Sequence, residues 1–108
     1  MVEVITLYST PATIAGAISN VLLAESRGDV DNAKTFQVSV AGTGSVSAVV
    51  DIEVSNDGVN FLVLATATLN GTTSASDGFV TEAPWASFRA NLKSISGTGA
   101  AVQVNVGK

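Results

Sequence analysis

Asp51 and Glu53 are the residues whose types and spacing come nearest to catalytic chemistry in this chain. They stand two positions apart in an alternating segment, so a strand would place both carboxylates on one face, about 6.6 Å apart along the backbone. Carboxyl pairs separated by roughly 5–10 Å hydrolyse glycosidic bonds, but the two groups must flank the substrate from opposite sides. Neighbours on one strand point the same way. We therefore interpret the pair as a solvated outer face.

Two oxygen-rich loops are the candidate cation sites. Asp29, Asp31 and Asn32 offer the oxygen ligands that calcium prefers, but the Gly and distal Glu of an EF-hand loop do not follow at the required spacing. Asp57 and Asn60 lie in a segment where a tight turn explains the composition better, because Asp and Asn favour turns. We predict polar loops, no metal site and no cofactor.

The sequence contains no His and no Cys. The usual ligands of zinc, copper and haem iron are therefore missing. The commonest general base, which is also the commonest partner of a nucleophilic serine, is missing as well. We expect a binding or structural protein that is not an enzyme and has no catalytic residue.

Charge is sparse in this chain of 108 residues, at 13% of the sequence with a formal net charge of −4. Its five Lys and Arg residues are spread along the chain and form no basic patch for nucleic acid or an anionic membrane. Sparse charge also indicates that part of the surface is normally covered, because large apolar patches rarely stay exposed. We predict protein partners, with no nucleic acid and no membrane.

Trp85 is the single tryptophan and follows Pro84. An exposed lone Trp can stack on a sugar or anchor an interface. A lone Trp at the entry to a strand more commonly plugs the core, and we favour that interpretation. Trp85, with Asp57 and Asn60, stays the candidate for a loop that contacts a ligand.

Alternating apolar residues predict four strands between Lys34 and Val106. The predicted inward positions are Phe36, Val38 and Val40, then Val46, Ala48, Val50, Ile52 and Val54, then Ala86, Phe88, Ala90 and Leu92, and finally Val102, Val104 and Val106. Residues 55–60 predict a hairpin connection with Gly58 at positive φ. Residues 70–78 are small and polar, and we predict a loop there.

The segment from Phe61 to Leu69 predicts a further strand, with apolar residues on both faces. Phe61, Val63, Ala65 and Ala67 would share one face, and Leu62 and Leu64 the other. A strand that is apolar on both faces is covered on both faces. The predicted cover is either the chain's own N-terminal segment or another subunit, and the candidate subunit interface is an apolar set made up of Leu62, Leu64, Val49, Ile5, Leu7 and Ile14.

No charged residue occurs from Val4 to Ala24. Ser, Thr, Asn and Pro interrupt the segment, so it does not predict a membrane span, and Glu3 stands where a signal peptide would be basic. Strands are predicted at 2–8 and 20–26, with a strand or a short helix at 12–19. We interpret residues 1–19 as an N-terminal arm that lies on its own domain or between subunits.

Short strands broken by Gly-rich turns, without a convincing helix, predict an all-β fold. A chain of this length suits a single domain. The sequence therefore predicts one antiparallel β-sandwich, or a jelly-roll-like fold, over residues 1–108.

Three stretches in order carry a resemblance: Ile52–Phe61 (IEVSNDGVNF), Ala83–Asn91 (APWASFRAN), and Gly97–Ala100 followed by Val102–Val104. This arrangement resembles small virion proteins of tailed bacteriophages. The resemblance implies a β-sandwich that decorates and cements the head, binding the major capsid protein or other virion proteins and copies of itself. A tail or fibre component is the alternative. The expected location is the virion, assembled in the cytoplasm of a bacterial host.

The Ser-Asn-Asp-Gly turn at 55–58 and the aromatic-Arg strand after Trp85 also resemble discoidin-type jelly rolls, which bind carbohydrates through loops at one end. The chain is shorter than those domains and lacks their clustered aromatic residues. A carbohydrate-binding module is therefore the alternative from a different functional class.

Overall fold

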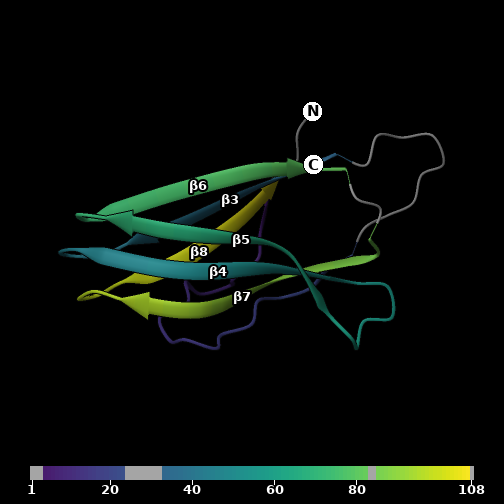
Figure 1. Ribbon diagram of the computed structural model, residues 1–108, viewed down its shortest axis with the longest axis horizontal. Coiled ribbons are helices and arrows are strands. Elements are labelled where there is room, and N and C mark those ends of the chain that lie inside the picture. The colour runs from purple at the N-terminus through teal and green to yellow at the C-terminus, as the bar shows by residue number, and fades with distance from the viewer. Residues whose placement is uncertain (1–3, 24–32, 83–84, 108) are drawn as a thin grey trace.

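The computed structural model describes residues 4–23, 33–82 and 85–107, and they form two antiparallel four-stranded sheets (Figure 1). The strands are β1 (Val4–Thr6), β2 (Leu22–Leu23), β3 (Lys34–Ala41), β4 (Val46–Ser55), β5 (Leu62–Gly71), β6 (Ser74–Thr81), β7 (Ser87–Ser96) and β8 (Ala101–Gly107). One sheet has the order β1-β8-β3-β6 and the other β2-β7-β4-β5. The predicted all-β sandwich is confirmed.

The strand pairing follows a jelly roll. β1 pairs with β8, β2 with β7, β3 with β6 and β4 with β5, while β3–β8 and β4–β7 join the pairs into sheets. Eight strands folded back on themselves in this way form the double-sheet jelly roll, an architecture found in both capsid and lectin domains. The described part of the chain contains no helix able to span a membrane.

The core lies between the sheets and is built from the predicted inward positions. Phe36 contacts Phe79 and Phe88, with ring centroids 5.0 and 5.7 Å away. Besides Phe36 and Phe88, the largest fully buried side chains are Leu7, Val38, Val40, Val50, Ile52, Val54, Leu92, Val102, Val104 and Val106. Ala86 is the exception among the predicted positions, because it is exposed and β7 begins one residue later.

Three turns meet at one end of the sandwich, on the left in Figure 1. The Thr43 amide donates to the Thr98 carbonyl at 3.0 Å, and the Gly42 amide donates to the Thr73 carbonyl at 2.8 Å. The 55–60 connection lies at the other end, where Gly58 has the predicted positive φ, 74°.

The predicted loop at 70–78 is wrong, because most of it belongs to β6. β5 ends at Gly71 and β6 begins at Ser74, so a tight turn carries the chain from one sheet to the other. A Cβ at position 71 would collide with the Ser74 carbonyl, which explains why glycine stands there. Because β6 consists largely of small and polar residues, it lacks the apolar alternation from which a strand is predicted.

Within the described residues the N-terminal strands are shorter than predicted. β1 ends at Thr6, before Leu7 and Tyr8 of the predicted 2–8 strand, and β2 begins at Leu22, after the first two residues of the predicted 20–26 strand. In place of a strand or helix at 12–19, isolated bridges join Ala12 to Val102 and Ile18 to Asn91, with a turn at Gly16 (φ 93°) between them. The candidate calcium ligands at 29–32 lie outside the described residues.

Candidate functional site

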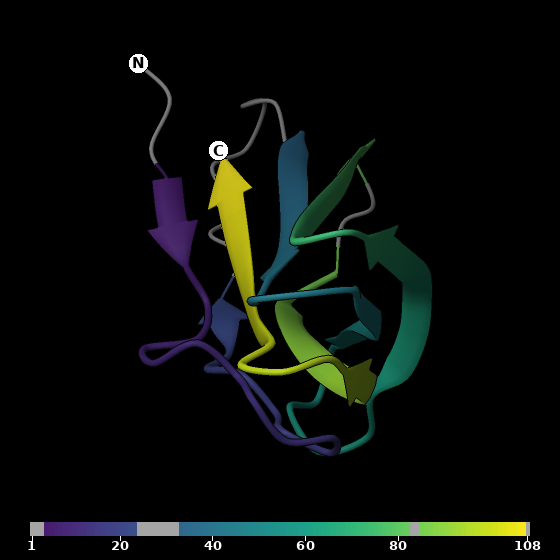
Figure 2. The same cartoon turned by 90° about the vertical axis from the view of Figure 1, so that its left-hand side faces the viewer.

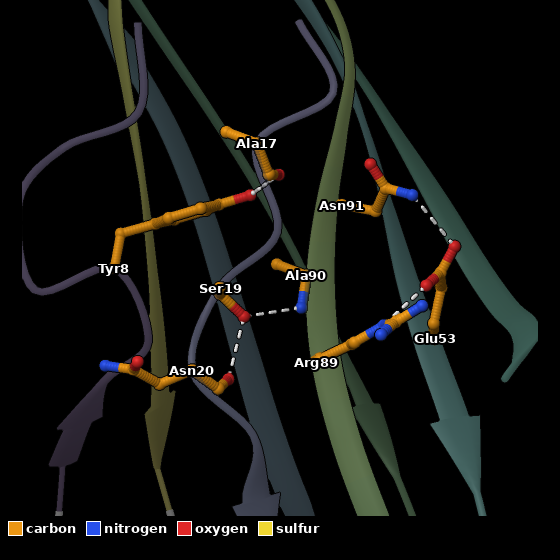
Figure 3. Close-up of polar contacts among 8 residues, drawn as sticks. All are labelled: Tyr8, Ala17, Ser19, Asn20, Glu53, Arg89, Ala90 and Asn91. Atoms are coloured by element: carbon orange, nitrogen blue, oxygen red, sulfur yellow. Dashed lines mark hydrogen bonds and ion pairs between the residues drawn. The ribbon is translucent and has the colours of Figure 1, made fainter. Parts of the chain in front are cut away.

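The outer face of the β2-β7-β4-β5 sheet carries an ion pair. Arg89 Nε donates to Glu53 Oε1 at 2.8 Å, and Asn91 Nδ2 donates to Glu53 Oε2 at 3.1 Å (Figure 3). The Arg89 guanidinium also lies 3.7 Å from the centre of the Phe61 ring. Burial alone would raise the pKa of Glu53, but the hydrogen bonds from Arg89 and Asn91 and the charges of Arg89 and Lys93 outweigh it, so the pKa falls below its usual value.

Asp51 lies on the same face, one row further along the sheet. It accepts a hydrogen bond from Thr66 Oγ1 at 2.7 Å. Asp51 and Glu53 are only 7% and 6% exposed. The interpretation of a solvated face is therefore wrong: the register brings Arg89, Asn91 and Thr66 over the two carboxylates. Alternating polar residues at 89 and 91 were the available signal, but one sequence does not specify which strands are neighbours.

The carboxylates of Asp51 and Glu53 are held in place side by side, and they do not face each other. Both stand on β4, point from the same face and are hydrogen-bonded to neighbouring strands. Among the residues that the structure describes, no three acidic side chains gather as metal ligands would. The pair therefore stabilises the outer face and presents no cleft between an acid and a base.

Asp57 and Asn60 form a self-contained turn. Asp57 Oδ1 accepts hydrogen bonds from Ser55 Oγ and from the Val59 and Asn60 amides, each at 2.8 Å. Asn60 Nδ2 donates to Asp57 Oδ2 at 2.9 Å. The backbone and side-chain hydrogen bonds lower the pKa of Asp57 far below its usual value. The turn interpretation accounts for this geometry, because both carboxylate oxygens are used locally.

Trp85 is partly buried and packs against the core cluster, as the plug interpretation expects.

The two leucines of β5 that were predicted to lie on a second, outer apolar face do not lie on that face. β5 contains a bulge opposite Ile52 and Glu53, which puts Leu62 in register with the buried Val54. Leu64 packs against the core from its half-buried position. An inserted residue reverses the alternation of a strand, so that part of the prediction is wrong.

The other predicted interface residues have different environments. Val49 is half-buried on the outer face, in register with Thr68 and Ser94. Ile5 is partly buried against the core. Leu7 is 1% exposed and belongs to the core, so its assignment to an interface is wrong. Ile14 is 73% exposed, which suits a contact residue.

Residues 4–23 form what we call the N-terminal edge, because they contain the edge strands β1 and β2 and run along β8 in one sheet and β7 in the other (Figure 2). The first half follows β8: the Leu7 amide donates to the Val104 carbonyl at 2.9 Å, and Ala12 exchanges two backbone bonds of 2.8 Å with Val102. The Gln103 side chain adds two bonds, accepting from the Tyr8 amide and donating to its carbonyl.

The second half follows β7 in the other sheet. The Ser19 amide donates to the Ala90 carbonyl at 2.9 Å, and the Ala90 amide donates to Ser19 Oγ at 2.7 Å (Figure 3). The Tyr8 hydroxyl joins the two halves by donating to the Ala17 carbonyl at 2.7 Å. Burial raises the pKa of Tyr8 to about 12, with the Glu53 charge adding to the shift and a backbone hydrogen bond at Leu92 opposing it. The segment thereby seals one side of the sandwich.

Large apolar side chains that are exposed gather along the two edges of the sandwich. Those of the N-terminal edge are Val4, Ile14, Ile18, Val21 and Leu23. Those on or beside β5 and β6 are Val59, Leu62, Val63 and Val80. Ile18 is in register with Asn91 and Leu23 with Ser87, so both border the polar outer face. The chain therefore exposes apolar side chains along its two edges, with the hydrogen-bonded polar residues of the outer face between them.

The side opposite the N-terminal edge is what we call the open edge, formed by β5 and β6. Within the described chain each of these strands pairs on one side only, β5 with β4 and β6 with β3. Figure 2 shows β5 curving along the flank farthest from the N-terminal segment. A strand at a sheet edge presents unpaired N–H and C=O groups.

Comparison with known proteins bears on the fold. No family model and no curated protein matches the sequence. Among solved structures, the SPBc2 prophage-derived protein YomS is similar at a TM-score of 0.60 and 10% identity, covering 99% of this chain and 94% of that one. A chain from Bacillus endospore appendages, described as disulfide-linked pili, aligns with a TM-score of 0.45 and 14% identity, over 99% of this chain and 84% of that one. The likeness to YomS shows a shared fold over nearly the whole of both chains.

Proposed function

We propose that this chain is a non-enzymatic structural protein of a bacteriophage particle, bound to the capsid as a decoration protein that contacts capsid subunits and copies of itself. The observation that carries the proposal is the set of exposed apolar side chains on the N-terminal edge, within a segment that has no charged residue. The fold shared with a prophage-derived protein supports it. We place it on the head rather than on the tail or a fibre.

The N-terminal edge suits a stable contact for physical reasons. Its backbone is already ordered by hydrogen bonds to β7 and β8, so binding immobilises little additional chain. Its side chains are uncharged, so removing them from water costs little, while covering Ile14, Ile18 and Leu23 is favourable. Many copies on a symmetric shell would add such contacts through multivalency.

The proposal that the protein is not an enzyme is supported by the hydrogen bonds of its carboxylates. Glu53, Asp51 and Asp57 each accept hydrogen bonds that hold the fold together. Jelly rolls occur in both capsid and lectin domains, so the fold does not decide between them. The packing of Trp85 against the core leaves the glycan-binding alternative without its expected exposed aromatic residue.

The test begins by finding a gene for a major capsid protein in the genome that encodes this chain, and then measures occupancy on capsids assembled from that protein. We expect wild-type protein to co-sediment with the capsids, and Ile14→Asp with Ile18→Asp to weaken binding at least about tenfold, because two charges would be buried at the contact. Thr72→Asp with Ser76→Asp adds the same two charges at exposed positions away from the N-terminal edge and is the matched control. Full occupancy by the double variant would refute the proposed contact, and absence of wild-type binding would refute the capsid role.

A further inference from the structure

β5 is the strand of the open edge that is least protected against pairing with another strand. Its ten residues, Leu62 to Gly71, contain no charge and no proline. Natural edge strands are normally shortened, charged or covered. β1 and β2 are only three and two residues long, and β6 carries the exposed Asp77. An unprotected ten-residue edge is expected to have a partner in the assembled protein.

The part of β5 beyond its bulge is regular and built from small or β-branched residues. From Ala65 to Gly71 the strand keeps an unbroken register with β4. Ala65 and Ala67 take the inner face, while Thr66 and Thr68 are exposed on the outer face. Small inner side chains let another strand approach closely, and threonines favour cross-strand pairs.

We propose that β5 pairs antiparallel with β5 of a second copy of this chain, about a two-fold axis near Ala67. The pattern Ala-Thr-Ala-Thr-Leu is nearly symmetric about that residue. Thr66 of one copy would stand opposite Thr68 of the other on the outer face, and Ala65 opposite Leu69 on the inner face. The two β2-β7-β4-β5 sheets would join into one sheet of eight strands. The inference deepens the self-association named in the proposed function and rests on it.

The near symmetry of the strand about Ala67 favours a second copy as the occupant, and the absence of charge on the strand permits it. Two copies of a chain with a net charge of −4 repel each other, and an uncharged strand is where they can meet with the least repulsion. The pairing also closes on itself: each copy uses its β5 edge once, and the joined sheet ends on both sides in β2, which is only two residues long. A two-fold contact of this kind gives a discrete dimer, not a filament.

The experiment combines light scattering after size-exclusion chromatography with amide hydrogen exchange over a range of protein concentrations. We expect a dimer whose dissociation is accompanied by faster exchange in residues 65–71. Thr68→Asp should raise the dimer dissociation constant at least about tenfold, because it adds two carboxylates roughly 7–8 Å apart across the axis. Ser76→Asp adds the same charge to the exposed face of β6 and should leave the dimer intact.

Each outcome decides the question. A protein that stays monomeric while the amides of residues 65–71 exchange freely overturns the pairing. A dimer that resists Thr68→Asp also overturns it, because the contact must then lie elsewhere. The exchange measurement on wild-type protein needs no variant, so a misfolded substitution cannot decide the result.

The capsid assay separates this inference from the proposed function. A monomer that still occupies capsids overturns the β5 contact and leaves the virion role standing. A β5 dimer that binds no capsid overturns the virion role and leaves the pairing standing.

Discussion

One edge of the sandwich is sealed by residues 4–23 of its own chain, whereas the opposite edge ends in β5 and β6, which pair on one side only in the described structure. The sealing segment is irregular, and its two halves bond to different sheets. β5 is ten residues long, keeps a regular register from Ala65 onwards, and uses only one side of its backbone in the described structure. Both edges expose apolar side chains.

Because they present different groups, the two edges can bind different kinds of partner. On the N-terminal edge the backbone groups of β7 and β8 are already used, so a partner meets side chains, chiefly Ile14, Ile18 and Leu23. On the open edge the backbone itself is available, so the natural partner is a strand. We therefore propose side-chain contacts with the capsid for the first edge and strand pairing between copies for the second.

The largest effect is expected from Tyr8→Ala, which would break the seal. Tyr8 is 5% exposed and its hydroxyl joins the two halves of the N-terminal edge. Truncating a buried aromatic residue costs about 3–5 kcal/mol of unfolding free energy, which urea denaturation would measure. Leu62→Ala on the open edge is the control and should cost much less, since Leu62 is 59% exposed. Equal losses would remove the distinction between the edges.

A smaller loss is expected from Ser19→Ala. Ser19 Oγ accepts the Ala90 amide in a buried position, and its removal takes away that acceptor. The expected destabilisation is about 1–3 kcal/mol, measured in the same denaturation assay. Thr13→Ala, at an exposed site on the same segment, should change stability by less than about 0.5 kcal/mol. Similar values for both variants would mean that the second half of the edge adds little.

High pH should loosen the sealed edge. The pKa of Tyr8 is raised from 10.0 to about 12 in the folded chain. The unfolded chain therefore loses this proton first, and the contribution that is complete below pH 10 is lost as the pH rises from 10 towards 12. Tyr8→Phe should remove this part of the slope, so the measurement is the difference between the two proteins across that range. If the free energy of unfolding changed with pH in the same way for both proteins, the Tyr8 hydroxyl would be exposed to water and the account of its burial would be wrong.

The smallest effect is expected from Thr68→Ala on the open edge. Thr68 is exposed and projects from the outer face. The stability of the monomer at high dilution should change by less than about 0.5 kcal/mol. A loss comparable with that of Ser19→Ala would show that β5 is covered within its own chain.

The sequence predicted the fold where the alternation is strict. The inward positions of β3, β4 and β8, together with Phe88, Ala90 and Leu92, are buried as predicted. Their pattern has a period of two and depends only on local residues. Gly58 was predictable for the same reason, because a turn needs its positive φ.

The sequence did not predict what depends on distant partners. The bulge at Leu64 is set by pairing with β4, and it moved Leu62 and Leu64 away from the predicted second face. The N-terminal edge is built from bonds to residues more than 70 positions away, such as Ser19 to Ala90. The ion pair of Glu53 with Arg89 needs a strand register that neither residue specifies.

Amide hydrogen exchange of the capsid-bound chain, compared with the free dilute chain, tests the assignment of the two edges most directly. We predict added protection in two places: the Ala65–Gly71 part of β5, from pairing between copies, and residues 12–23, from cover by the capsid. Protection confined to the outer face of the β1-β8-β3-β6 sheet, with both edges unchanged, would contradict the account.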